Sequence, residues 1–214
     1  KAMSWFTRSA WMLPSVSGLI AIPLWPKSAS ASAAIFALRT SGFAGTISLR
    51  PSTMIAAIYD WTASLHRHGF EKIYWFNGHG GNIATITAAF SEIYADVSLK
   101  RTGANAAPVR CTLRNWWELS GVGELCRELF PVGEGSHATA SEVSVTYAAF
   151  PDAIKRVEMS PKIAPTGPIL DADDYRRRFP DGRIGSDPSQ ATPEKGERII
   201  AAAARALAAD YERF

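Results

Sequence analysis

The sequence predicts a single layered α/β/α domain built on a mostly parallel sheet. Short apolar runs alternate with amphipathic helical patterns along the chain. Strands that alternate with helices usually form a parallel sheet covered on both faces. The chain has 214 residues, 47% of them hydrophobic and 20% charged, which is an ordinary globular composition. This length suffices for one domain with a sizeable core.

The first half of the chain contains three predicted strands and two predicted helices. Residues 18–24 favour a short buried strand, 27–34 a Ser/Ala-rich loop, and 42–49 a glycine-bounded turn that enters a strand. A helix then begins near Pro51, and Gly69 ends it. Its apolar positions recur at helical spacing and are Met54, Ile58, Trp61 and Leu65. Residues 73–76 favour a strand, and a second amphipathic helix follows from Ile83 to Ile93.

The second half continues the alternation and ends in a long helix. The pattern predicts a strand at 109–113, a short helix at 121–130, a helix at 138–150, a strand or connection at 155–159 and a surface loop at 161–188. Thr192 caps the last helix, and Pro193 occupies its first position. Its predicted inward face consists of Ile199, Ile200, Ala203 and Leu207.

The first 59 residues contain no Asp, Glu or His, and the first carboxylate is Asp60. Three explanations fit this bias: a transit peptide, an apolar buried strand with a loop, or a stretch foreign to the domain through truncation or a shifted reading frame. We therefore divide the chain into an atypical segment at 1–41 and an α/β domain at 42–214.

Composition also limits the partners of the chain. The net charge of +3 is too small to indicate nucleic acid, and Arg176-Arg177-Arg178 is typical of a solvated face. We find no run of 18 apolar residues, so no membrane span is expected. Two cysteines do not make a disulfide framework, and a reducing cytoplasm is the default expectation.

A glycine-rich loop, Asn77-Gly78-His79-Gly80-Gly81-Asn82, follows the strand at 73–76. The carboxyl edge of a parallel sheet is where ligands bind in α/β folds. A phosphate cradle is one interpretation of such a turn. However, the spacing matches neither dinucleotide nor Walker loops, and the loop lacks Lys. A metal-binding imidazole at His79 is the better interpretation.

A second candidate constellation is His137-Ala138-Thr139-Ala140-Ser141-Glu142, which follows a glycine-rich lead-in. A histidine at a helix start can act as a general acid or base near neutral pH. Glu142, about one and a half turns into the helix, can bind a metal or orient the histidine. A plain helix surface is the competing interpretation.

These motifs resemble the creatininase (creatinine amidohydrolase) family of metal-dependent hydrolases. The His79 loop and the pattern His137-Ala138-x-x-x-Glu142-x-Ser144 carry the resemblance. Residues 42–48 are similar to the F-P-G-T-I-S segment of that family. Residues 182–196 are similar to its C-terminal G-x-x-G-D-P…A-T-x-E-K-G signature.

The resemblance implies a parallel α/β fold with a binuclear zinc or manganese centre. It also implies hydrolysis of C–N bonds in small cyclic or formyl amides, often by hexamers. By this resemblance, His79 and Glu142 are metal ligands, with Glu142 alternatively a partner of the catalytic histidine, and His137 is the proton shuttle to the leaving nitrogen. The predicted substrate-binding residues are Trp116, Trp117, Asn77, Gly80 and Gly81; simple core packing is the alternative for the tryptophans.

The sequence departs from the family at one motif. The early E-Q-H-G-P-H-L-P motif and the Asp after it have no counterpart before Asp60. Catalytic zinc usually has three protein ligands, and His79 with Glu142 supplies two. Two hypotheses follow: a metal-dependent amidohydrolase, or a catalytically impaired creatininase-like scaffold that acts as a binding or partner subunit.

Overall fold

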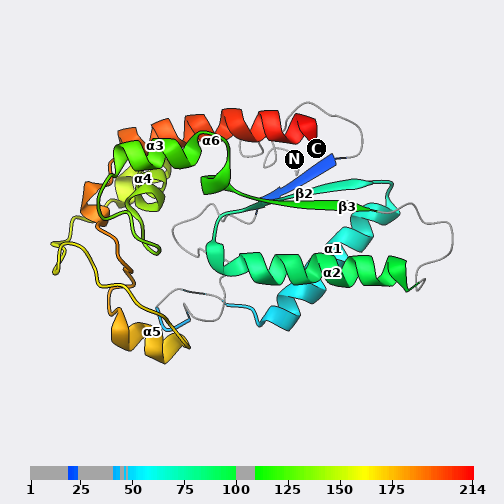
Figure 1. The fold of residues 1–214 in the computed structure, drawn as a ribbon, viewed down its shortest axis with the longest axis horizontal. Coiled ribbons are helices and arrows are strands. Elements are labelled where there is room, and N and C mark those ends of the chain that lie inside the picture. Colours follow the sequence, from blue (N-terminus) through cyan, green and yellow to red (C-terminus); the bar gives the residue numbers. More distant parts are fainter. Residues whose placement is uncertain (1–18, 24–40, 44–45, 47, 100–108) are drawn as a thin grey trace, which may run out of the picture.

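The computed structural model describes residues 19–23, 41–43, 46, 48–99 and 109–214. Its sheet consists of three parallel strands in the order β1-β2-β3. Strand β1 spans Leu19–Pro23, β2 Lys72–Asn77 and β3 Arg110–Asn115. Helices lie on both faces of this sheet, as Figure 1 shows, so the predicted layered α/β/α class is confirmed.

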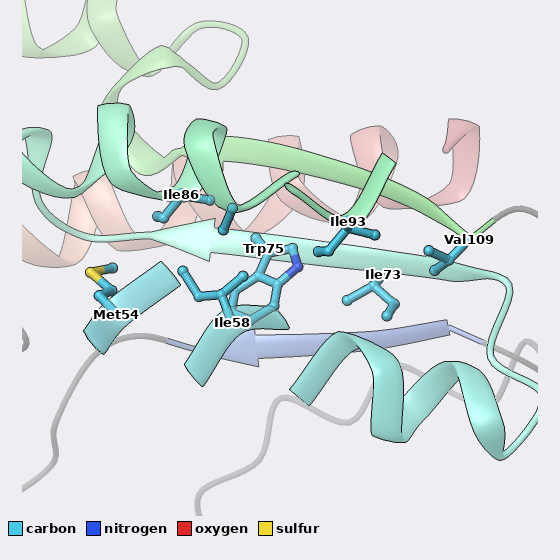
Figure 2. Packing of buried hydrophobic residues seen from close by; sticks show 8 residues of the cluster. Met54, Ile58, Ile73, Trp75, Ile86, Ile93 and Val109 are labelled. Carbon is cyan, nitrogen blue, oxygen red and sulfur yellow. The ribbon is translucent and has the colours of Figure 1, made fainter. Parts of the chain in front are cut away.

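Helices α1 (Pro51–Arg67) and α2 (Ile83–Ser98) cover one face of the sheet. Between them and the strands lies an apolar cluster centred on Trp75, which is completely buried (Figure 2). The other buried members of the cluster are Met54, Ile58, Ile73, Ile86, Ala89, Ile93 and Val109. The helical spacing read from the sequence therefore identifies most of this core. Trp61 is the exception, because it is 42% exposed while it stacks on Trp75.

The other face of the sheet is covered by α6 (Pro193–Arg213), which extends beyond the sheet to α3 (Val122–Leu129) and α4 (Ala140–Ala149). Tyr74 of β2 packs its ring against Tyr211 of α6 and donates a hydrogen bond to Asp210 at 2.8 Å. Asp210 also accepts from Arg114 Nε of β3 at 2.7 Å. One carboxylate thus ties the last helix to two strands.

Helices α4 and α6 cross at very close range. A Cβ added at Gly196 of α6 would lie 1.9 Å from the carbonyl oxygen of Ser144 in α4. Only a residue without a side chain fits there. A cluster containing Val122, Phe130, Ala140 and Ile199 joins α3, α4 and α6 into a second core.

Residues 161–188 do not form only a surface loop, so that prediction is wrong in part. They contain α5 (Ala172–Arg178), and both Tyr175 and Phe179 are buried. The aromatic ring of Phe43 and the aliphatic side chain of Ile184 complete a small third core there. Arg183 is 3% exposed because its guanidinium group bonds Asp181 and three backbone carbonyls. The buried residues of this segment are isolated aromatic and charged side chains. They form no apolar periodicity, so pattern analysis did not predict their packing.

The strand predicted within 42–49 is wrong, because the described residues there include a single bridge position, Ser48, and no strand. Other predicted features agree with the structure or lie outside the described residues. Arg177 and Arg178 are solvent-facing, as predicted, and both pair with Asp174. Residues 155–159 form a connection, and Gly69 follows α1 with a φ of 88°. Of segment 1–41, the structure describes only β1 and Ser41, so its distinct character stays a prediction. No helix among the described residues is long and apolar enough to cross a bilayer.

Candidate functional site

The His79 loop is fixed by its first asparagine. Asn77 ends β2 and is completely buried. Its Nδ2 donates to the carbonyl oxygen of His79 at 2.8 Å, while its Oδ1 accepts from the His79 amide at 3.2 Å. Asn82 also donates to Asn77 Oδ1, at 3.3 Å. A single amide side chain therefore holds both backbone groups of His79 at the carboxyl edge of the sheet.

The neighbouring strand supports this asparagine. Asn115 ends β3 and stands in register with Asn77. Asn77 Nδ2 donates to Asn115 Oδ1, and Asn115 Nδ2 donates to Glu118 Oε2, both at 2.7 Å. Glu118 belongs to the short helical turn η3 (Trp116–Glu118). Sequence reasoning missed Asn115 and Glu118, although an asparagine at the end of each neighbouring strand was a usable signal.

One polar atom in the loop points to a ligand. Asn82 is 2% exposed, and its Oδ1 has no hydrogen-bond partner among the described residues. Burying an acceptor without a donor is costly. Asn82 lies in the turn η2 (Gly80–Asn82) directly after His79. A donor on a bound molecule would remove this cost.

His137 is positioned by a loop with unusual backbone geometry. Gly135 has a φ of 71°, and a Cβ there would lie 2.5 Å from backbone atoms of Ile184, Gly185 and Ser186. His137 forms an isolated antiparallel bridge with Ile184. Its carbonyl oxygen accepts a hydrogen bond from Ser186 Oγ at 2.7 Å. Residues of the C-terminal signature at 182–196 thus hold the backbone of His137 in place.

The imidazole of His137 is bonded through Nδ1. This nitrogen lies 2.7 Å from the carbonyl oxygen of Gly182. The hydroxyl of Tyr175 lies 2.5 Å from the same nitrogen. Because a carbonyl oxygen can only accept, the short contact with Gly182 requires the proton to be on Nδ1. In the neutral ring, Nε2 is then the basic nitrogen.

The two candidate histidines come together although 58 positions separate them in the chain. Their ring centroids are 5.9 Å apart and the rings are nearly perpendicular, at 87°. Burial, with a smaller contribution from the positive charge of His137, lowers the pKa of His79 to about 4. His79 is therefore neutral at physiological pH, the form that binds a metal or accepts a proton.

Glu142 is engaged at the start of α4. Its carboxylate accepts from the Thr139 amide and hydroxyl at 3.2 Å each, while Thr139 Oγ1 accepts from the Glu142 amide, forming a capping box.

A second carboxylate, Glu134, accepts from the amide and the hydroxyl of Ser141. Burial raises the pKa of Glu134. Sequence reasoning missed Glu134, which lies in the glycine-rich lead-in to His137.

The two tryptophans occupy different environments. Trp116 is 8% exposed, lies in the core that joins α3, α4 and α6, and its Nε1 has no partner among the described residues. Trp117 packs edge-on against it at 5.8 Å and is partly buried. Its Cζ2 is 4.0 Å from the position that a Cβ on Gly80 would take. Trp117 thus lies beside the His79 loop.

The described side chains do not assemble a metal centre. No group of three His, Cys, Asp or Glu residues suited to a metal occurs in the described part of the chain. The stretches outside it, 1–18, 24–40, 44–45, 47 and 100–108, contain none of these four residue types. Among the described residues, His79 and Glu142 belong to no such group of three.

Comparison with known proteins identifies relatives over most of the chain. The family model "Creatininase: Creatinine amidohydrolase" matches residues 26–211. A creatinine amidohydrolase of Pseudomonas putida is 25% identical over 174 residues, which are 78% of this chain. The match spans 64% of the length of that curated relative.

Solved structures agree with this assignment at the level of fold. A glutamate-to-glutamine variant of creatininase complexed with creatine is 23% identical with a TM-score of 0.66, covering 84% of this chain and 72% of that one. A Zn-Zn form of the same kind of variant is 23% identical with a TM-score of 0.65, covering 84% and 71%. With a family model that spans all of the described site residues, the chain belongs to the creatininase family.

Proposed function

We propose that the chain hydrolyses a C–N bond of a cyclic amide or formamide-type substrate, with His137 as the proton shuttle. One observation carries the proposal: the His137 ring is held through Nδ1 by a backbone carbonyl and stands 5.9 Å from the His79 ring at the ligand-binding edge of the sheet. Such an imidazole can pass a proton through Nε2 to a leaving nitrogen.

The other site residues have supporting roles in this proposal. Asn77 holds the His79 loop, and Gly80 and Gly81 let a substrate approach the backbone closely. Trp117 forms a wall beside the loop, while Trp116 supports it from the core. The buried Oδ1 of Asn82 offers an acceptor to an N–H group, which an amide substrate carries.

Family membership implies a divalent metal, zinc or manganese, with His79 and Glu142 as its ligands. A metal would polarise the amide carbonyl and activate water. The described ligand set does not fit a catalytic metal, because three protein ligands are usual and the part of the chain that the structure describes brings no such group together. Glu142 is also occupied as a helix cap. In this proposal, His137 carries out the proton transfer, and the transfer does not depend on a metal.

The missing ligand group favours a second candidate function. The chain would then be a catalytically impaired scaffold that binds a small molecule or a partner subunit through the His79 and His137 loops. A homo-oligomer, by analogy a hexamer, is part of either proposal. Metal content separates the two candidates, because about two tightly held ions per chain would require ligands beyond those assembled here.

Purified protein should be assayed for hydrolysis of creatinine and formamide-type substrates, with and without added Zn²⁺ or Mn²⁺. We expect turnover, and a loss of about 100-fold or more in kcat for His137→Gln. His68→Gln, at the exposed end of α1, is the matched control and should retain full activity. A well-folded sample without turnover under all these conditions would reject the hydrolase and leave the scaffold.

A further inference from the structure

Tyr175 is a buried aromatic residue whose hydroxyl lies in the candidate site. It comes from α5, in a segment that carries no recognised motif. The residue is 0% exposed. Its hydroxyl lies 2.5 Å from His137 Nδ1 and 2.7 Å from the carbonyl oxygen of Gly182. Three polar atoms thus form a closed triangle, since Nδ1 is itself 2.7 Å from that carbonyl.

Only one placement of the protons satisfies all three contacts of this triangle. The hydroxyl carries one proton and Gly182 O carries none. If the hydroxyl donated to Nδ1, the lone pair of Nδ1 would face the carbonyl oxygen at 2.7 Å, and the carbonyl would lose both of its donors. All contacts are favourable only when Tyr175 donates to Gly182 O and Nδ1 carries its own proton.

The surroundings keep Tyr175 in this role. Its ring makes edge contacts with Phe43, Phe179 and His137, with centroids 5.1, 5.8 and 5.3 Å away. Burial and the nearby carboxylates of Glu142 and Asp181 raise the pKa of Tyr175. The hydroxyl therefore stays protonated near neutral pH and can donate to Gly182 O.

We propose that Tyr175 is a positioning residue that, together with the carbonyl of Gly182, holds His137 in the Nδ1–H tautomer and directs the basic Nε2 to the substrate. Its effect on turnover rests on the proposed function of His137. The tautomer itself does not, because it follows from the three contacts alone. Tyr175 does not touch the reacting atoms in this proposal.

The test is Tyr175→Phe, which keeps the ring and removes only the hydroxyl. Tyr74→Phe is the matched control, because it removes a buried hydroxyl that bonds Asp210 of α6 and not the site. The tautomer of His137 is measured by ¹⁵N NMR of histidine-labelled protein, with the signals assigned by their loss in His137→Gln. Steady-state kinetics of the same variants gives kcat and KM separately.

We expect a single Nδ1–H tautomer in the wild type and in Tyr74→Phe. In Tyr175→Phe, the equilibrium constant for the Nε2–H form over the Nδ1–H form should rise about threefold to tenfold, the ratio that one neutral hydrogen bond supplies, so that an Nε2–H signal becomes detectable. kcat should fall in proportion to the Nδ1–H fraction that is lost, with KM unchanged. A wild type with His137 in the Nε2–H form overturns the proposal even if the variant does not fold. So does a folded Tyr175→Phe protein with an unchanged tautomer ratio.

The two proposals fail in different ways. If neither wild type nor variants turn over an amide, but the tautomer changes in Tyr175→Phe, the proposed function falls and the positioning role stands. If turnover depends on His137 while Tyr175→Phe leaves both tautomer and kcat unchanged, the function stands and the positioning role falls.

Discussion

The two histidines of the candidate site are held in opposite ways. His79 stands on a short turn between a strand and a helix, and its backbone bonds a side chain two residues away. His137 stands on a loop whose supports lie 38 to 49 positions later, at Tyr175, Gly182 and Ser186. The first arrangement is local in sequence. The second depends on the folding of a distant segment.

This difference predicts that destabilising substitutions around the sheet core affect His79, and that those around the crossing of α4 with α6 affect His137. The α1–α2 side of the sheet should determine global stability and the His79 loop. The crossing of α4 with α6 and the 161–188 segment should determine the His137 loop. The following variants separate these contributions, from the largest expected effect to the smallest.

Trp75→Ala should give the largest loss. Trp75 is 0% exposed and fills the centre of the sheet core, so the substitution leaves a large cavity. We expect the unfolding free energy to fall by about 3 to 5 kcal/mol in urea denaturation. Trp61→Ala is the control, because Trp61 stacks on the same ring but is 42% exposed. Equal losses for the two variants would contradict the assignment of the core.

Gly196→Ala should disturb the other half by about 3 kcal/mol. The added methyl group would overlap the carbonyl oxygen of Ser144, so α6 must move away from α4. Gly123→Ala in α3, where the nearest atom is 3.4 Å away, should change stability by less than about 1 kcal/mol. The measurement is thermal unfolding, with NMR signals of His137 and His79 as local reporters. A larger change at His79 than at His137 would break the comparison.

The pH dependence of stability reports on His79. Its folded pKa of about 4 lies below the ordinary value of 6.5, so the unfolded chain binds more protons between these values. The stabilisation is present above pH 6.5 and is lost as the pH falls towards 4, by up to about 3 kcal/mol. Urea denaturation of chelator-treated protein should show this slope, and His79→Gln should lack it. Parallel curves for the two proteins would disprove the assignment.

Asn115→Ala should have the smallest effect, about 1 to 2 kcal/mol. It removes the bonds to Asn77 and Glu118 but leaves Asn77 bonded to the backbone of His79. We expect faster hydrogen exchange in residues 78–82 and no change at His137. Unchanged exchange in that loop would show that Asn77 needs no support from β3.

Periodicity predicted the regular half of the molecule well. The strand and helix around the His79 loop follow from Ile73 to Phe76 and from the spacing of Ile83, Ile86 and Ile93, because these patterns need only local geometry. The family motifs also identified both histidines. Tyr175 could not be predicted, because nothing near it in the sequence shows that α5 packs under His137. Glu142 was predicted as a metal ligand, and that assignment stays a proposal.

The last helix connects the two halves of the molecule. Its 21 residues span about 30 Å. One end contacts α4 where Gly196 meets Ser144, seven residues after His137 in the sequence. The other end is bonded through Asp210 to β2 and β3, the strands that end in Asn77 and Asn115. Helix α6 therefore acts as a spacer with a fixed length between the two halves. A variant at Asp210 should therefore loosen the end of α6 that lies on the sheet and leave its crossing with α4 intact.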